Sequence, residues 1–196
     1  SASYGLRRKI ESIPQATTFL GLNTLKEVVL ISALKQSLGE ITTFQSLIWN
    51  NAQRFALFSK TLAFTLDGVS SEAAYLVVLF NDVGALIIEK RHPEYANFYR
   101  AGLSDPMLAL EQETSHFGTN RAVISFLLSK HWNLPEKVSI AIYNSHIASS
   151  AVMVDPEIRT LIAIFKITES LSKQLIIPSL ELSDAANQIL ADAYIE

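Results

Sequence analysis

The chain of 196 residues contains no cysteine, which excludes disulfide bonds, thiolate zinc sites and cysteine nucleophiles. Charge is also sparse, because charged residues make up only 18% of the sequence and the formal net charge is -3. The basic residues are scattered, and we interpret the short cluster 7–9 as a solvated helix face. The charge pattern therefore does not indicate a surface that binds nucleic acid or an anionic membrane. The sequence also lacks a glycine-rich phosphate loop, a serine elbow and a nucleotide fingerprint.

Hydrophobic residues are abundant, at 49% of the chain, so 196 residues can bury one substantial core. The most apolar run extends from Ala73 to Ile88, and Asn81 and Asp82 interrupt it. We therefore expect a core segment and no membrane span. The opening residues show no basic-then-apolar pattern of a signal peptide. Together with the absence of cysteine, this composition predicts a cytoplasmic protein.

Helix start and stop residues recur along the chain. Thr42 or Thr43 is predicted to begin a long helix that ends by Gly68, and Ser70 or Ser71 to cap the segment that carries Asn81 and Asp82. Further helices are predicted from Pro14 to Gly21, from Asn23 to Gly39, at Asp105–Pro106, at Thr119, at Leu134–Pro135, at Asp155–Pro156 and after Ser183. No stretch shows the two-residue alternation of a strand. The sequence predicts an all-α protein, folded as a single irregular multi-helix bundle.

Asp82 raises the question of what surrounds a carboxylate in the middle of an apolar run. Burying an unpaired carboxylate costs several kcal/mol, so Asp82 implies a metal, hydrogen-bond donors, a proton or a polar cleft. Other polar residues with ligand-like chemistry recur at helix positions that otherwise face the core. These are Asn51, Asn81, Asn120, His146 and Glu169.

These polar residues lie within motifs that resemble the HDOD family, the non-catalytic bacterial signalling relatives of HD-superfamily metal-dependent phosphohydrolases. The motifs are Trp49-Asn50-Asn51, the segment 79–84 (LFNDVG), the segment 117–120 (FGTN), the segment 132–135 (WNLP) and Ser145-His146, with the opening segment 1–6 (SASYGL) in support. The resemblance covers nearly the whole chain and implies an HD-domain-like fold. Family members carry more helices before this point. We therefore expect residues 1–196 to form an HDOD-type helical domain that lacks its first helices or an upstream domain.

The resemblance also implies where a metal site would lie. In the catalytic superfamily, histidines, a histidine-aspartate doublet and a distal aspartate hold a divalent metal that activates water against a phosphoester. This chain has Asn51, Asn81 and Asn120 at histidine positions and Glu169 near the distal aspartate, whereas Asp82 is unchanged. An asparagine amide cannot replace imidazole as a ligand for zinc, iron or manganese. We therefore expect a vestigial site without metal, cofactor or catalytic residues.

Several polar and aromatic residues carry simpler interpretations. We interpret the asparagines as hydrogen-bonding groups that satisfy Asp82. His146 is interpreted as a structural histidine, with a surviving metal ligand as the alternative. Trp49 and Trp132 are expected to pack in the core, although tryptophan also anchors partners. The acidic residues Asp105, Glu111 and Glu113 are expected to form a solvated helix face.

The sequence therefore predicts a non-enzymatic regulatory module of bacterial signal transduction that acts through protein–protein interaction. The resemblance implies a protein partner or an adjoining sensor, receiver or cyclic-dinucleotide phosphodiesterase domain, and a homodimer stays open. Nucleic acid and membrane are not expected as partners. One alternative is a phosphohydrolase or phosphodiesterase that holds a hard metal through Asp82, Glu169 and His146. Another is that the vestigial cleft binds a small ligand, such as a nucleotide, without hydrolysing it.

Overall fold

The computed structural model describes residues 29, 32–33, 36, 42–147 and 149–176. The chain divides into two compact units, Ser1–Glu40 and Ile41–Glu196. The few described residues of the first unit are helical. The predicted helices from Pro14 to Gly21 and after Ser183, and most of the one from Asn23 to Gly39, lie outside the described residues. The architecture below is that of the second unit.

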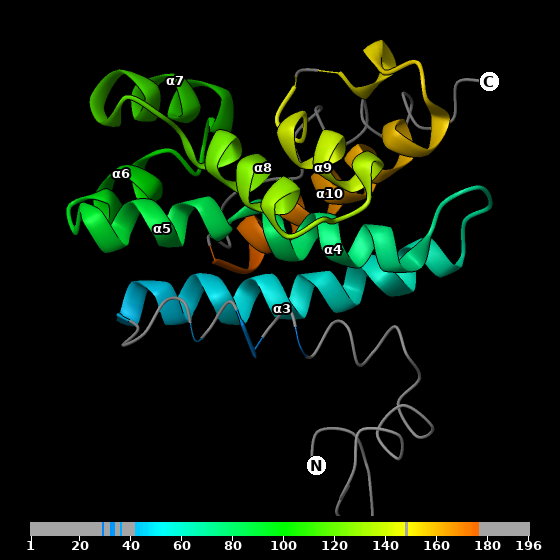
Figure 1. Ribbon diagram of the computed structural model, residues 1–196, viewed down its shortest axis with the longest axis horizontal. Coiled ribbons are helices and arrows are strands. Elements are labelled where there is room, and N and C mark those ends of the chain that lie inside the picture. Colours follow the sequence, from blue (N-terminus) through cyan, green and yellow to red (C-terminus); the bar gives the residue numbers. More distant parts are fainter. Residues whose placement is uncertain (1–28, 30–31, 34–35, 37–41, 148, 177–196) are drawn as a thin grey trace, which may run out of the picture. The chain divides into compact units, whose positions relative to one another are not determined.

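Every regular element that the structure describes in this unit is helical, which confirms the all-α prediction (Figure 1). The elements are α3 (Thr43–Phe64), α4 (Ser71–Asn81), α5 (Val83–Arg91), α6 (Tyr95–Ala101), α7 (Pro106–Phe117), α8 (Arg121–His131), α9 (Glu136–Tyr143), the 3-10 helix η2 (Ser150–Val152) and α10 (Pro156–Ile176). Helix α4 contacts α3, α8, α9 and α10 and forms the centre of the bundle.

The central position of α4 explains its apolar sequence. Val77 and Phe80 are completely buried, and Leu79 is only 1% exposed. A helix that is apolar on all sides is expected where neighbours cover it completely. By length and composition, Ser71–Arg91 is the one stretch of the described chain that could cross a membrane, but 72% of it is buried inside the bundle. We therefore regard it as core.

The predicted helix starts are mostly confirmed, because the capping side chains form local hydrogen bonds. Thr42 Oγ1 accepts from the Gln45 backbone N–H at 3.1 Å, and Ser70 Oγ accepts from that of Ala73 at 3.2 Å. Asp105 and Asp155 also cap the helices that follow them. The predicted start at Thr119 is wrong by one residue. Asn120 has the extended backbone of an N-cap, and its side chain caps α8.

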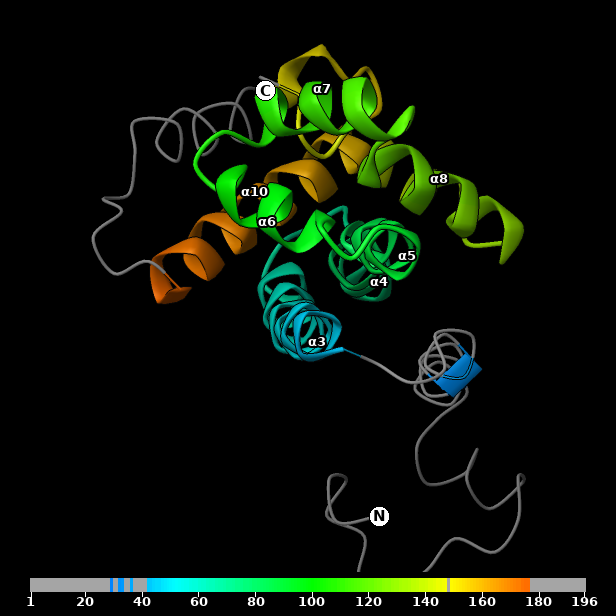
Figure 2. The ribbon, with the colours of Figure 1, turned by 90° about the vertical axis from the view of Figure 1, so that its left-hand side faces the viewer.

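The apolar run does not form one continuous helix, because the backbone breaks at Asp82 between α4 and α5. The two helices follow each other along nearly the same line beside α3 (Figures 1 and 2). The hydroxyl of Ser125 on α8 accepts from the Gly84 backbone N–H at 2.9 Å and donates to the Asn81 carbonyl at 2.7 Å. A side chain from α8 thus satisfies two backbone groups that the break releases.

Gly84 is required by the close approach of α8. A Cβ atom at this position would lie 2.1 Å from the carbonyl oxygen of Arg121, which no side chain can occupy without moving the backbone. The sequence Asn81-Asp82-Val83-Gly84 therefore does two things: it breaks the core helix and allows the start of α8 to pack against the break.

Candidate functional site

Three of the predicted site residues line one pocket of about 330 Å³: Asn51 from α3, Asp82 from the break between α4 and α5, and Glu169 from α10. They meet because α10 packs against both α3 and α4. His146 lies behind the pocket wall, with Nδ1 3.8 Å from Glu169 Oε1 and its ring edge-on to Phe165 at 5.4 Å. Its side chain is only 4% exposed, which agrees with the structural interpretation.

The other two asparagines serve different purposes. The Asn120 amide donates to Thr114 Oγ1 at 2.9 Å, and its oxygen accepts from the Val123 backbone N–H at 3.0 Å as the cap of α8. Asn81 is 2% exposed, and its Nδ2 has no hydrogen-bond partner. The interpretation that these two asparagines satisfy Asp82 is therefore wrong. Asn120 instead caps α8, and Asn81 lies buried in the core.

Asp82 faces both a cation, Arg121, and the hydroxyl of Tyr99, which donates a hydrogen bond to it. Nε of Arg121 lies 3.9 Å from Asp82 Oδ1, and the arginine side chain is only 5% exposed. Arg121 is the first residue of α8, so the contact at Gly84 that brings α8 to the break also brings the guanidinium to Asp82. The guanidinium also lies 5.3 Å from the centre of the Tyr99 ring, within the range of a cation–π contact.

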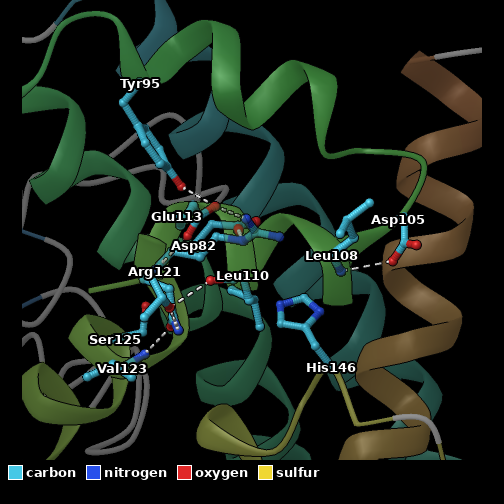
Figure 3. A network of polar contacts seen from close by, with 12 residues as sticks. Asp82, Tyr95, Asp105, Leu108, Leu110, Glu113, Arg121, Val123, Ser125 and His146 are labelled. Carbon is cyan, nitrogen blue, oxygen red and sulfur yellow. Dashed lines mark hydrogen bonds and ion pairs between the residues drawn. The ribbon is translucent and has the colours of Figure 1, made fainter. Parts of the chain in front are cut away.

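Arg121 is held from its other side by Glu113 of α7. The Glu113 carboxylate forms a buried ion pair with the guanidinium and also accepts from the Arg121 backbone N–H at 2.8 Å. The Tyr95 hydroxyl donates to the same carboxylate at 2.9 Å. Figure 3 shows Tyr95, Glu113, Arg121 and Asp82 converging. Four helical segments therefore meet in one polar network, which we call the Arg121 network.

Glu113 corrects the sequence analysis, which expected it on a solvated helix face. Its side chain is 2% exposed, whereas Asp105 and Glu111 are exposed as predicted. Only a weak signal could have indicated this, namely that Glu113 follows the buried Ala109 by four residues and so shares its helix face. Trp49, by contrast, is 3% exposed and lies in the core as predicted.

The network fixes the charge of Arg121 and of the two tyrosines. Burial raises the pKa of Asp82, partly offset by the Arg121 charge, and the nearby charge of Glu169 raises it further. Burial lowers the pKa of Arg121, but Glu113, the two tyrosines and Asp82 together outweigh that effect and the pKa is raised. Burial raises the pKa of Tyr95 and of Tyr99. Arg121 is thus a permanent cation, and both phenols are neutral at physiological pH.

An all-α bundle with these residues at one pocket is the architecture of an HD-like domain. The family model of the HDOD domain matches residues 1–148, and the chain belongs to the HDOD family. Among curated proteins none matches the chain.

Solved structures share the fold. A protein named "Putative phosphohydrolase" from Shewanella amazonensis SB2B has a TM-score of 0.72 at 23% identity, covering 99% of this chain and 70% of its own. An HDOD domain protein from Geobacter sulfurreducens has a TM-score of 0.68 at 19% identity, and the match covers 99% of this chain and 69% of the Geobacter chain. The response regulator MmoQ from Methylococcus capsulatus str. Bath has a TM-score of 0.62 at 17% identity, covering 100% and 76%. At these identities the likeness concerns the fold.

The residues present do not fit the metal of the catalytic HD superfamily. Within the described part of the chain, no three His, Asp or Glu side chains come close enough to hold a metal ion together. In addition, Arg121 places a fixed positive charge beside Asp82, the one ligand position that the sequence resemblance predicts to be unchanged. A divalent cation there would have to compete with the guanidinium for the carboxylate, and its double charge would be repelled more strongly than the single charge of an organic cation.

Proposed function

We propose that this domain is a non-catalytic signalling module that transmits information through contact with a protein partner or an adjoining signalling domain. The observation that carries the proposal is the Arg121 network, which puts a buried cation beside Asp82. In a metal-dependent phosphohydrolase this carboxylate would bind the ion that activates water. Here it faces Arg121, whose guanidinium forms an ion pair with Glu113 on its other side.

Contact with another protein is supported by exposed apolar side chains on α3. Leu57 is 60% exposed, Phe58 42% and Phe64 84%. Contiguous exposed apolar groups are typical of surfaces that other proteins cover, and Leu57 and Phe64, seven residues apart on one helix, share a face. The similarity to MmoQ, which is named a response regulator, supports an adjoining receiver or another signalling domain. A bacterial, cytoplasmic location follows from the same proposal.

A combined measurement of metal content and turnover tests the proposal. The purified chain would be analysed for bound metal and then assayed on phosphodiester and phosphomonoester substrates with added manganese or magnesium. We expect metal well below one ion per chain and no turnover above that of a protein-free reaction, with the same result for Glu111→Gln, a control variant of an exposed residue outside the site. Turnover that requires Asp82, and is lost in Asp82→Asn, would overturn the proposal.

The second candidate is a hydrolase with a divergent ligand set. It is favoured by one observation: Asp82 and Glu169 line the same pocket, and His146 contacts Glu169. In that case, metal uptake and turnover should fall together in Asp82→Asn and Glu169→Gln. The same assay therefore separates the two candidates.

A further inference from the structure

The pocket above Asp82 has mostly apolar walls. Phe44 and Phe55 of α3, Val78 of α4 and Phe165 of α10 all line it. Its volume of about 330 Å³ lies at the lower end of the roughly 300–1,000 Å³ found for small-molecule sites. The size and the walls therefore suit a small ligand with an apolar body.

The charged groups of the pocket are predominantly acidic. Asp82 and Glu169 both line it, so two carboxylates of like charge border one cavity, and His146 Nδ1 lies 3.8 Å from the Glu169 carboxylate on its far side. Arg121 offsets this only in part, because Glu113 shares its charge. Arg100 also lines the pocket, but it is exposed and solvent screens its charge. An additional cation between the two carboxylates would relieve their repulsion.

The aromatic rings select the kind of cation. Aromatic rings attract ammonium groups, and Phe44, Phe55 and Phe165 line the pocket; Tyr99 lines it too, but its ring already contacts the Arg121 guanidinium. A hard metal ion needs several oxygen or imidazole ligands, and the described residues do not supply such a set. An anion, including the phosphates of a nucleotide, would meet two carboxylates. Apolar walls with two acidic groups are thus complementary to an organic ammonium ion.

We propose that this pocket binds a small amphipathic organic cation, with its ammonium group between Asp82 and Glu169 and its apolar body against the phenylalanines of α3 and α10. The proposal deepens the non-catalytic function, on which it rests, by naming the ligand class that the former metal site would sense. Binding would connect α10 to the break between α4 and α5, and through Asp82 to the Arg121 network.

Three probes of the same shape test the charge preference: 4-phenylbutylamine, the neutral 4-phenylbutanol and the anionic 4-phenylbutyrate. Each would be titrated into the purified full chain by isothermal calorimetry, with the thermal midpoint as a second readout, since a ligand of the folded state raises it. We expect the amine to bind, the alcohol to bind about tenfold more weakly or not at all, and the acid not to bind. Equal or tighter binding of the acid, or no binding of the amine, would overturn the proposal.

Two variants show whether the binding occurs in this pocket. Asp82→Asn and Glu169→Gln should each weaken the amine by about tenfold while leaving the alcohol unchanged. Glu111→Gln, on the exposed side of α7, is the matched control and should change neither. Amine affinity that persists in both pocket variants would contradict the proposed site. The titration contains no metal and measures no turnover. A negative result would therefore reject the cation-binding proposal without bearing on the proposal that the domain is non-catalytic, which the metal and turnover assay tests.

Discussion

At the scale of single residues, Arg121 determines the character of the site. Its side chain is buried between two carboxylates, Glu113 and Asp82, and its position depends on both the α7–α8 turn and the break at Asp82. A buried charge is stable only while its main counter-charge, here Glu113, is present, so removing that partner costs far more than the pair contributes overall. Glu113 is therefore expected to be one of the most sensitive positions in the bundle.

Glu113→Gln should lower the free energy of unfolding by about 3 kcal/mol, because it leaves the guanidinium of Arg121 buried without its main counter-charge. Urea denaturation followed by circular dichroism measures the effect. Glu111→Gln is the matched control on the same helix and should change stability by less than about 0.5 kcal/mol. Equal stability of the two variants would show that the Arg121 network does not hold the fold together.

Asp82 should make the stability of the folded protein depend on pH. The pKa of its carboxyl is raised above 3.8 in the folded state, so the folded state binds this proton more tightly than the unfolded state does. The contribution of the proton to stability is complete below pH 3.8 and is lost as the pH rises through the folded-state pKa.

Asp82→Asn removes this ionisation while keeping a polar side chain of the same shape. The variant should therefore have a higher free energy of unfolding than the wild type at pH 7, which means that it is more stable. This difference in stability should shrink as the pH falls towards 3.8. Denaturation curves at a series of pH values check this. A difference that grows on acidification would show that Arg121 stabilises the charged carboxylate by more than burial costs it.

At the scale of the elements, the sequence predicts where helices begin better than how they meet. Thr42, Ser70, Asp105 and Asp155 are caps because their side chains bond to backbone groups within three residues, and such local chemistry can be recognised in one sequence. The break at Asp82 depends instead on α8, which supplies Ser125 from more than 40 residues away. No local pattern contains that information.

The close approach of α5 and α8 predicts a large effect of one methyl group. Gly84→Ala should destabilise the protein by about 3 kcal/mol or more, although alanine favours helices, because its Cβ would overlap the Arg121 carbonyl. Gly118→Ala is the comparison. There nothing lies within 4 Å, and only the positive φ of 71° opposes the substitution, at about 1–2 kcal/mol. The reverse order of stabilities, measured by thermal unfolding, would contradict the packing at the break.

Asn120, which the sequence resemblance aligned with a histidine position, is instead the cap of α8. Asn120→Ala should cost about 1 kcal/mol by removing the bond to the Val123 backbone N–H, whereas Asn120→Asp should retain most of the stability. Thr119→Ala, one residue earlier, is the control and should have little effect. If the two alanine variants cost the same in urea denaturation, the capping role of Asn120 is disproved.

At the scale of the whole molecule, the sequence predicts the fold class and part of the site. The apolar patterning and caps indicate a helical bundle, and the motifs around Asn51, Asp82 and Glu169 indicate residues that do line one pocket. The group that faces Asp82 could not be predicted. Glu113 and Arg121 are separated by a turn, and they pair because that turn places the first residue of α8 beside the end of α7.

The account rests on a guanidinium that stands beside Asp82 in place of a metal ion. Equilibrium dialysis of the purified chain against Mn²⁺, compared with Asp82→Asn, tests this most directly. We predict no stoichiometric uptake and no difference between the two proteins. One bound ion per chain that is lost in the variant would contradict the account.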